Sequence, residues 1–326
     1  MNPTLNPPAV SVILPTHNRP ELLLEAINSL LQQTRADWEA IVVDDASTPP
    51  AVVPDDPRIR VVRHDRGKGG AACKNTGVAL ARAPVVAFLD DDDLYAPTYL
   101  ERALGVLDRN PDLDVIFMGV SWFGSAGANG QNNYDEAMTR ALTEAKGTTI
   151  ENGVVSFDER LLDALLKSVP MGFQRPVVRR SALERIGAYR PDCLLWDCDW
   201  AISAALNVRT AHVTDGLYLQ RAEGQGTSSR GDRRIDHMKS GIEIKQRLVH
   251  DTRHGRYPHH HLLPKFRAAL GKAWFDLAWH HYQQQDRRKA LDALRCSALT
   301  NFNIGTLKLL WRLIQPRLGA KTPNES

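Results

Sequence analysis

An α/β fold with a doubly wound sheet, followed by a helical region, is the architecture that this sequence predicts. Short apolar runs alternate with helix-like segments over the first hundred residues, which is the pattern of parallel strands joined by crossover helices. Clusters of aspartate follow two of the apolar runs. From about residue 235 onward, apolar side chains recur at helical spacing instead.

The elements of the first part follow from local signals. Strands are expected where short runs are rich in β-branched residues, and helices where apolar side chains recur every three or four positions. Proline suits the first turn of a helix, because that turn leaves its N–H groups unpaired. These signals predict strands at 10–14, 39–43, 59–63 and 85–89, and helices beginning near Pro20, at 71–82 and at 97–109.

The later part is less regular. A strand is expected at 114–120, and the Gly/Asn/Ser-rich stretch 123–133 is expected to be a loop. Residues 220–234 combine glycine, serine and arginine without a core-forming pattern, which predicts a mobile segment. The remaining helices are expected at 157–168, 181–186, 192–206 and, with breaks, from 235 to 318.

Bulk composition excludes several classes of protein. The 326 residues are 43% hydrophobic and 24% charged, which is ordinary globular usage. A net charge of +3 is too small to favour a nucleic-acid partner, so none is expected. The four cysteines are scattered without CxxC spacing, which favours free buried thiols in a reduced, cytoplasmic setting. No apolar run approaches the roughly 20 residues that a membrane span needs.

Four consecutive aspartates, Asp90 to Asp93, directly follow the predicted strand 85–89. Carboxylates packed at a strand end repel one another, so they need a cation or several hydrogen-bond donors. A hard divalent ion prefers oxygen ligands, and open α/β sheets bind ligands at the carboxyl ends of their strands. The tetrad therefore predicts a metal–diphosphate site; the alternative is a solvated acidic turn that caps the next helix.

Two further stretches lie near the tetrad in the predicted topology. Asp44 and Asp45 end the strand 39–43, so parallel pairing would bring them to the same sheet edge. Gly67 to Gly70 opens a helix and could cradle phosphate, but it lacks the order of a Walker loop, and taken in isolation the stretch favours a flexible turn. Lys68 and Lys74 would supply positive charge there.

A third acidic cluster is the stretch Trp196 to Trp200. On a helix, Asp197 and Asp199 would point in different directions, so one of them would face a given cleft. A carboxyl group between tryptophans can be desolvated, which raises its pKa toward that of a general base; the alternative is a capping acid beside core aromatics. The histidine triplet at 259–261 and the histidine pair at 280–281 are expected on a solvated helical surface.

The order of these motifs resembles that of family 2 glycosyltransferases. Residues 69–77 resemble the family segment G-x-x-x-A-R-N-x-G, with Lys74 where arginine is usual. Residues 88–97 resemble its metal motif F-L-D-x-D-D-x-x-x-P. Residues 187–199 resemble G-x-[FY]-x followed by E-D-x-D, with Trp196 replacing the usual glutamate. The stretches 10–19, 30–34 and 38–47 resemble the family's opening.

The resemblance implies an A-type glycosyltransferase fold, a Rossmann-like doubly wound mixed sheet with a C-terminal helical extension. It implies inverting transfer of a sugar from a nucleotide-diphospho-sugar, expected to be UDP-linked, to a hydroxyl of a carbohydrate or lipid-linked acceptor. Such a reaction belongs to the synthesis of cell-envelope polysaccharide or another glycoconjugate. The implied domains are a catalytic domain at 1–234, with a nucleotide-binding half at 10–110 and an acceptor half at 111–234, and a helical region at 235–326.

The same match assigns residues to roles. Asp197 takes the place of the catalytic base and Asp92 that of the ligand to Mn²⁺ or Mg²⁺. The positions matched to nucleotide binding are Pro15, His17, Asn18, Arg19, Asp45, Lys74, Asp90 and Asp91, and those matched to supporting places are Asp93, Asp199 and Arg221. Composition and place also suggest that Arg221 or Arg230 closes over the diphosphate.

Two other functions use similar parts. A nucleotidyltransferase also combines such a sheet with Mg²⁺ and aspartates, but it opens with a Gly-rich basic loop that is absent after the first strand here. A non-catalytic module would bind a nucleotide sugar or a partner without transfer. The C-terminal helices are expected to pack on the catalytic domain, form a homodimer, or contact an anionic membrane carrying the acceptor, in which case the protein is peripheral at its inner face.

Overall fold

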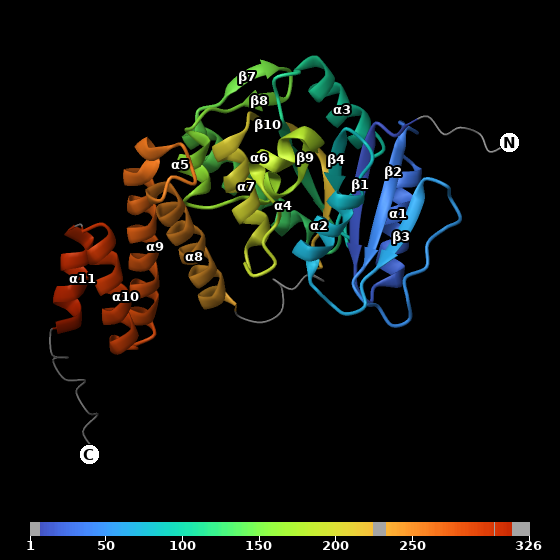
Figure 1. The fold of residues 1–326 in the computed structure, drawn as a ribbon. Helices are drawn as coiled ribbons and strands as arrows, with labels where there is room; N and C mark the ends of the chain where they lie inside the picture. The colour runs from blue at the N-terminus through green and yellow to red at the C-terminus, as the bar shows by residue number, and fades with distance from the viewer. Residues whose placement is uncertain (1–6, 224–232, 303, 315–326) are drawn as a thin grey trace. The chain divides into compact units, whose positions relative to one another are not determined.

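The computed structural model describes residues 7–223, 233–302 and 304–314. The chain forms two compact units, residues 1–231 and 232–326, which are described separately (Figure 1). Within the described ranges, every helix is too short or too polar to traverse a bilayer. The assignment of 10–110 to the nucleotide and 111–234 to the acceptor stays a prediction.

The first part of unit one has the alternation of strands and helices that the sequence predicts. Strands β1, β2, β3 and β4 pair in parallel in the order β3-β2-β1-β4. Each is a short run with few or no exposed apolar positions, as expected for strands covered on both faces. The elements are β1 Val10–Thr16, α1 Pro20–Leu31, β2 Trp38–Asp44, β3 Ile59–Arg63, α2 Gly70–Leu80, β4 Val85–Phe88, β5 Leu94–Tyr95 and α3 Tyr99–Arg109.

The second part of unit one extends the sheet and makes it mixed. Strand β9 lies antiparallel between β4 and β6, and the order continues β9-β6-β10-β8-β7, with β5 paired to β10. Its elements are β6 Val115–Phe123, α4 Gly127–Ala145, β7 Thr148–Glu151, β8 Val154–Ser156, α5 Leu161–Leu165, η1 Met171–Gln174, β9 Pro176–Arg179, η2 Arg180–Ala182, α6 Leu183–Ile186, α7 Trp196–Asn207 and β10 Thr210–Arg221.

Helices cover both faces of this sheet, which confirms the doubly wound architecture. Alternate residues of β1, among them Val12 and Leu14, pack in one core cluster with buried residues of α1 and α3. The opposite face of β1 carries Ile13, against which α2 packs closely. A Cβ atom at Gly77 would lie 2.2 Å from Ile13 Cγ2, so α2 can approach β1 only because residue 77 is glycine.

A bulge in β10 sets the position of its last residues. The register against β6 shifts between Val213 and Tyr218, where β10 bends away from regular pairing. The bend fits only because Gly119 faces it on β6, where a Cβ atom would lie 2.6 Å from the Asp215 carbonyl oxygen. Beyond the bulge, pairing resumes and carries β10 to Arg221, toward the end of β4.

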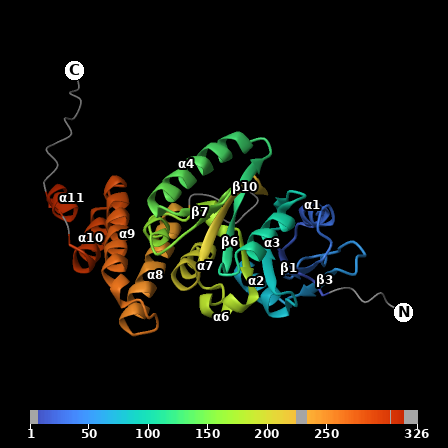
Figure 2. The same cartoon turned by 90° about the horizontal axis from the view of Figure 1, so that it is seen from above.

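Two local predictions in unit one are wrong. The stretch 123–133 is not a loop, because β6 runs to Phe123 and α4 begins at Gly127. Packing overrides the weak helix propensity of this stretch, because α4 lies on β6 (Figure 2). The ring of Trp122 occupies the space that a side chain at Gly130 would fill. The helix expected at 157–168 is only the short α5. The predicted mobile segment 220–234 overlaps β10 at its start, and its residues 224–232 lie outside the described residues.

Unit two is helical, as predicted, and α9 contacts each of the other α-helices described there. Its buried side chains include Leu248, Phe266, Leu277 and Leu294. The helices are α8 Arg234–Arg253, η4 His260–Leu262, α9 Leu263–Gln283, α10 Arg287–Thr300 and α11 Ile304–Ile314. A solvated surface was the expectation for His280 and His281, and it is wrong: both are buried. Sequence spacing alone did not reveal that this end of α9 faces inward.

The four cysteines are free thiols. Cys73 and Cys193 are buried as expected, whereas Cys198 and Cys296 are half-buried.

Candidate active site

Three adjacent strands end at one edge of the sheet and bring the predicted site residues together. Strand β1 lies between β2 and β4 and is parallel to both. The residues that follow them therefore meet, as in other open α/β sheets. The Thr16 hydroxyl donates to Asp91 Oδ2 over 2.8 Å, and His17 Nδ1 lies 2.7 Å from the Asp45 carbonyl oxygen.

The loops after β1 and β2 are also tied to each other. Asn18 adopts a left-handed conformation with φ of 54°, which asparagine tolerates better than most residues. Its backbone N–H donates to Ser47 Oγ over 3.0 Å, and its Oδ1 accepts from the Thr48 N–H over 2.7 Å. His17 and Asn18 are exposed and Pro15 is half-buried, so the first two present polar groups at the edge.

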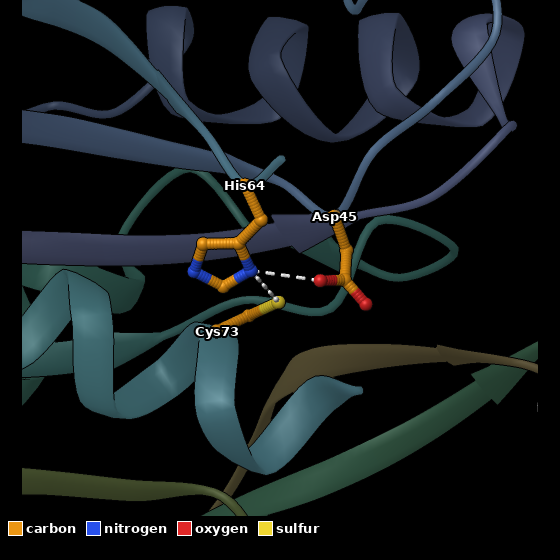
Figure 3. A group of neighbouring side chains, drawn as sticks. All are labelled: Asp45, His64 and Cys73. Atoms are coloured by element: carbon orange, nitrogen blue, oxygen red, sulfur yellow. Dashed lines mark hydrogen bonds and ion pairs between the residues drawn. The ribbon is translucent and has the colours of Figure 1, made fainter. Parts of the chain in front are cut away.

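Asp45 is held by a compact group of neighbours (Figure 3). His64 Nδ1 lies 2.8 Å from Asp45 Oδ1, and Cys73 Sγ lies 3.8 Å from the same nitrogen. The backbone N–H groups of Lys68 and Gly69 each donate to the Asp45 carboxylate over 2.8 Å. Burial opposes ionisation of Asp45, but these hydrogen bonds lower its pKa below the usual value.

This group has the atoms of a metal site, since one ligand atom from each of Asp45, His64 and Cys73 lies within 4.8 Å of the others. Burial and the charge of Asp45, however, raise the pKa of the Cys73 thiol to about 12. His64 Nε2 is engaged as well, 2.9 Å from Thr76 Oγ1. The group is therefore complete as a hydrogen-bonded support for Asp45, and the turn 67–70 directs two of its N–H groups at that carboxylate.

Asp90 is paired with two buried cations. Lys74 Nζ lies 3.0 Å from Asp90 Oδ1, and Arg175 Nη2 lies 3.5 Å from Oδ2. Burial would raise the pKa of Asp90, but the charges of Lys74 and Arg175 outweigh it and lower that pKa to about 2. Asp90 is therefore ionised, and its side chain keeps 30% of its surface exposed at the edge of the sheet.

Asp91 and Asp92 share a third cation. Arg19 Nη1 lies 2.8 Å from Asp91 Oδ1 and 3.1 Å from Asp92 Oδ2. Burial raises the pKa of Asp91 to about 6, against the opposing effect of Arg19. Burial and the neighbouring charge of Asp90 also raise the pKa of Asp92. A further positive charge near this pair would offset that cost.

Asp93 is fully buried and points into the protein. The Tyr218 hydroxyl donates to its Oδ2 over 2.9 Å, and the Arg221 backbone N–H donates to its Oδ1 over 2.9 Å. Arg175 Nη2 lies 3.4 Å from Oδ2. Burial raises the pKa of Asp93 to about 7 despite Arg175. The residue thus links the tetrad to the end of β10.

Arg175 is the principal site residue that the sequence does not reveal. It lies directly before β9, and its guanidinium, 6% exposed, lies between Asp90 and Asp93 and over the ring of Tyr218 at 4.6 Å. Its Nε atom is buried without a hydrogen-bond partner among the described residues. No local motif marks this arginine, because its partners lie in the loop after β4 and on β10.

Arg221 meets the tetrad from the other side. Its Nε donates to the Asp92 carbonyl oxygen over 3.0 Å, and its guanidinium also pairs with Glu25 of α1 and lies over the ring of Phe123. Arg221 therefore helps to fix the tetrad loop in place. The other candidate for closing over a diphosphate, Arg230, lies outside the described residues.

The first turn of α7 brings Asp197 near this group. Its Oδ1 accepts from the Cys198 N–H over 2.8 Å, and its charge raises the pKa of Arg175. Asp199 is buried on another side of the helix, where its charge acts on Arg190. The two acids thus diverge, as their helical spacing predicts, and Asp197 is the one that acts on the tetrad's partner.

The two positions where the chain departs from the family pattern are in contact. Lys74 Nζ lies 4.7 Å from the centroid of the Trp196 ring, in a cation–π arrangement. The ring of Tyr189 packs edge-on against Trp196 at 5.3 Å. Lys74, only 3% exposed, is therefore enclosed by aromatic rings on one side and by Asp90 on the other.

The tetrad has more carboxylates than cations that pair directly with them. Three cations, Arg19, Lys74 and Arg175, pair with the four carboxylates of the tetrad. Asp90 and Asp92 stay partly exposed, with 30% and 16% of their side-chain surface accessible. Oxygen donors of this kind suit a hard divalent cation, so the residues fit such an ion.

Comparison with known proteins places this edge in context. Residues 11–167 match the model of the family described as glycosyl transferase family 2. An Escherichia coli protein named UDP-Glc:alpha-D-GlcNAc-diphosphoundecaprenol beta-1,3-glucosyltransferase WfgD is 33% identical over 105 residues, which is 31% of this chain and 42% of that protein. This chain spans less than half the length of the curated relatives that it matches.

Solved structures resemble the chain over most of its length. S. aureus TarS 1-349, in complex with UDP-GlcNAc, superposes with a TM-score of 0.60 at 16% identity, covering 89% of this chain and 81% of that one. The mannosyltransferase PcManGT from Pyrobaculum calidifontis, in complex with GDP-Man and Mn²⁺, gives a TM-score of 0.52 at 18% identity over 94% and 79%. At such identities the likeness concerns the fold.

Proposed function

Because residues 11–167 of this chain belong to glycosyl transferase family 2, we propose that it transfers a sugar from a nucleotide-diphospho-sugar to an acceptor hydroxyl with inversion at the anomeric carbon. Its mixed sheet is the A-type glycosyltransferase fold that the resemblance implies. The observation that carries the proposal is the convergence of Asp45, the tetrad and Asp197 around one sheet edge.

The nucleotide would lie along the ends of β1, β2 and β4. His17 and Asn18 are exposed there and present a ring and an amide to a base, while Asp45 is fixed behind them. Asp91 and Arg19 would flank the ribose and the diphosphate. A UDP-linked donor is proposed because the named relative uses UDP-Glc and the first structural relative holds UDP-GlcNAc.

A divalent ion, Mn²⁺ or Mg²⁺, would be held by Asp92, with Asp90 beside it. When bound, such an ion supplies the positive charge that stabilises the diphosphate as it leaves. Arg19 contributes positive charge at the same place, because it already pairs with Asp91 and Asp92. Arg175 and Lys74 keep Asp90 ionised, so its carboxylate stays available to the ion.

Asp197 is proposed as the general base. A carboxylate that removes the acceptor proton while the acceptor oxygen attacks the anomeric carbon permits a single displacement, which inverts that centre. Asp197 lies in the first turn of α7 and is half-buried, whereas Asp199 is buried, so Asp197 is the acid of this turn that an acceptor can reach. The acceptor is proposed to be a carbohydrate or lipid-linked sugar, in polysaccharide or glycoconjugate synthesis.

Release of the nucleoside diphosphate from a panel of UDP- and GDP-sugars, with and without Mn²⁺, tests this proposal. We expect metal-dependent release that falls by about 10²-fold or more in Asp197→Asn, with UDP binding kept, because a positioned base contributes about that much. Asp92→Ala should lose both metal dependence and turnover. Glu136→Gln, which alters an exposed acid on α4, is the matched control and should turn over normally.

The alternatives predict other outcomes. Asp197→Asn with full turnover would rule out Asp197 as the base. Binding of UDP-sugars without any turnover would favour a non-catalytic module, and release of pyrophosphate from a nucleoside triphosphate and a sugar phosphate would favour a nucleotidyltransferase.

A further inference from the structure

Helix α11 is apolar on two opposite sides. Leu309 and Leu313 are buried against unit two, with 1% and 4% of their surface exposed. Ile304, Leu307 and Trp311 lie on the other side and are 70%, 50% and 63% exposed. With Ile314 they recur at intervals of three and four residues, which places them in one stripe along the helix. The stripe has no partner among the described residues.

The stripe continues onto the end of α10. Leu299 is 74% exposed and Phe302 is 62% exposed, and both directly precede α11 in the chain. We call these six side chains the α11 patch: Leu299, Phe302, Ile304, Leu307, Trp311 and Ile314. They are half of the twelve large apolar side chains that are exposed within the described ranges, and five of the six most exposed. Such a concentration marks an interaction surface.

The surroundings of the patch are positively charged. Arg295 on α10 and Lys308 on α11 are exposed beside it, and Arg312 is exposed with its guanidinium over the ring of Trp279. The acid that is nearest in sequence is Asp292, exposed on α10. From 293 to 324 the sequence contains no acidic residue, and its basic residues are Arg295, Lys308, Arg312, Arg317 and Lys321.

We propose that the α11 patch docks onto an anionic lipid surface. An apolar stripe that includes tryptophan and is flanked by lysine and arginine is the composition of helices that lie in the headgroup region of a bilayer. The same charges argue against a second copy of this chain, because a symmetric contact would bring like charges together. A lipid surface satisfies the apolar and the basic groups at once.

The inference does not depend on the proposed transfer reaction, although a lipid-linked acceptor would be found at such a surface. Each lysine or arginine close to an anionic membrane strengthens binding about fivefold at ordinary ionic strength. Because that contribution is electrostatic, it is screened by salt, whereas the contribution of the apolar stripe is not.

Flotation of the full chain with lipid vesicles tests the proposal. We expect binding to vesicles of phosphatidylcholine with about a third phosphatidylglycerol, weaker binding to phosphatidylcholine alone, and a decrease at high salt. The double variant Leu307→Glu/Trp311→Glu should reduce binding at least about tenfold, since it places charge in the stripe. Val52→Glu is the control: Val52 is 76% exposed in unit one, and its replacement should leave binding unchanged.

A second variant separates the two contributions. Arg295→Glu/Lys308→Glu should abolish the preference for anionic vesicles while retaining weak binding to neutral ones. All four positions are exposed, so circular dichroism and UDP binding should match those of the unaltered chain. Equal flotation of the Leu307→Glu/Trp311→Glu variant and the unaltered chain would overturn the proposal. A dimer that this variant dissociates, without vesicle binding by the unaltered chain, would assign the patch to a second copy instead.

Discussion

The two acidic clusters at the sheet edge are stabilised in different ways. Asp44 and Asp45 accept hydrogen bonds from backbone N–H groups of turns. Asp44 also pairs with Arg63 at the end of β3, and Asp45 with His64, the next residue. Asp90 to Asp93 are held mainly by side-chain cations from other elements: Lys74 of α2 pairs with Asp90, Arg19 is 72 residues from Asp91, and Arg175 is 82 residues from Asp93.

This difference shows which part of the edge can respond to a ligand. A carboxylate that is satisfied by backbone N–H groups is fixed by the fold itself. A carboxylate that is paired with a side-chain cation can exchange that partner for another charge, such as a metal ion. Asp45 is thus built as a fixed reference point, and the pair of Asp91 and Asp92 with Arg19 is the adjustable part.

The largest loss of stability is expected from removing Arg175, which pairs with Asp90 and Asp93. Arg175→Met deletes a buried cation and leaves Asp90 and Asp93 without it, so we expect the free energy of unfolding to fall by about 3–5 kcal/mol. Urea denaturation followed by circular dichroism measures this. Arg185→Met removes an exposed ion pair with Asp114 and should cost within about 1 kcal/mol. A similar small cost for Arg175→Met would mean that the tetrad does not depend on it.

The change in folding stability at low pH depends on His212 as well as on the two acidic clusters. His212 on β10 is buried, and neither ring nitrogen has a partner among the described residues. Burial lowers the pKa of His212 to about 4. The unfolded chain therefore binds a proton more readily between pH 6.5 and 4, so stability falls as the pH falls through this window.

We expect His212 to contribute a loss of about 3 kcal/mol across that window, and His212→Phe to remove it. Urea denaturation at a series of pH values gives the slope for both proteins. An unchanged slope in His212→Phe would assign the acid sensitivity to other groups, the two clusters included.

Loss of the histidine beside Asp45 should have a moderate effect on the first cluster. His64→Phe removes the ring that hydrogen-bonds to Asp45 and Thr76, so we expect destabilisation of about 1–3 kcal/mol. Thermal unfolding of matched samples measures it. The same change at the exposed His260 should stay within about 0.5 kcal/mol. If His64→Phe were equally mild, the backbone N–H groups alone would be holding Asp45.

The smallest expected effect is the coupling between Lys74 and Trp196. A double-mutant cycle with Lys74→Met and Trp196→Leu isolates it from the pairing of Lys74 with Asp90. We expect a coupling free energy of about 1–2 kcal/mol, the range of a desolvated cation–π contact. Additive single changes would show that the ring merely encloses the lysine.

The sequence predicts the parts of the molecule whose signals are local. Strand β3 has the predicted limits 59–63, and β1, β2 and β4 lie within two residues of theirs, because β-branched runs bounded by turn residues need no distant information. The stretch 123–133 is different. Its glycines and asparagines disfavour a helix, and only packing against Trp122 and β6 makes α4 form there.

The site residues also divide into those with a local sequence signal and those that depend on the fold. The carboxylates of the tetrad can be recognised because they are contiguous and follow a strand. Arg175 and Tyr218 cannot, since each meets Asp93 only through the sheet order β4-β9-β6-β10, which brings β9 and β10 to the same side of β4. Acids in a motif are thus visible in a sequence, whereas the cations that neutralise them are visible only in the fold.

The contact between Lys74 and Trp196 should constrain how these two positions change among related proteins. Both residues depart from the family pattern, and because they touch, neither is free to change independently of the other. Glutamate at 196 would add a carboxylate beside Lys74, whose charge already pairs with Asp90 together with that of Arg175. Related chains that keep lysine at the first position are therefore expected to keep an aromatic ring at the second, so that the pair is inherited together.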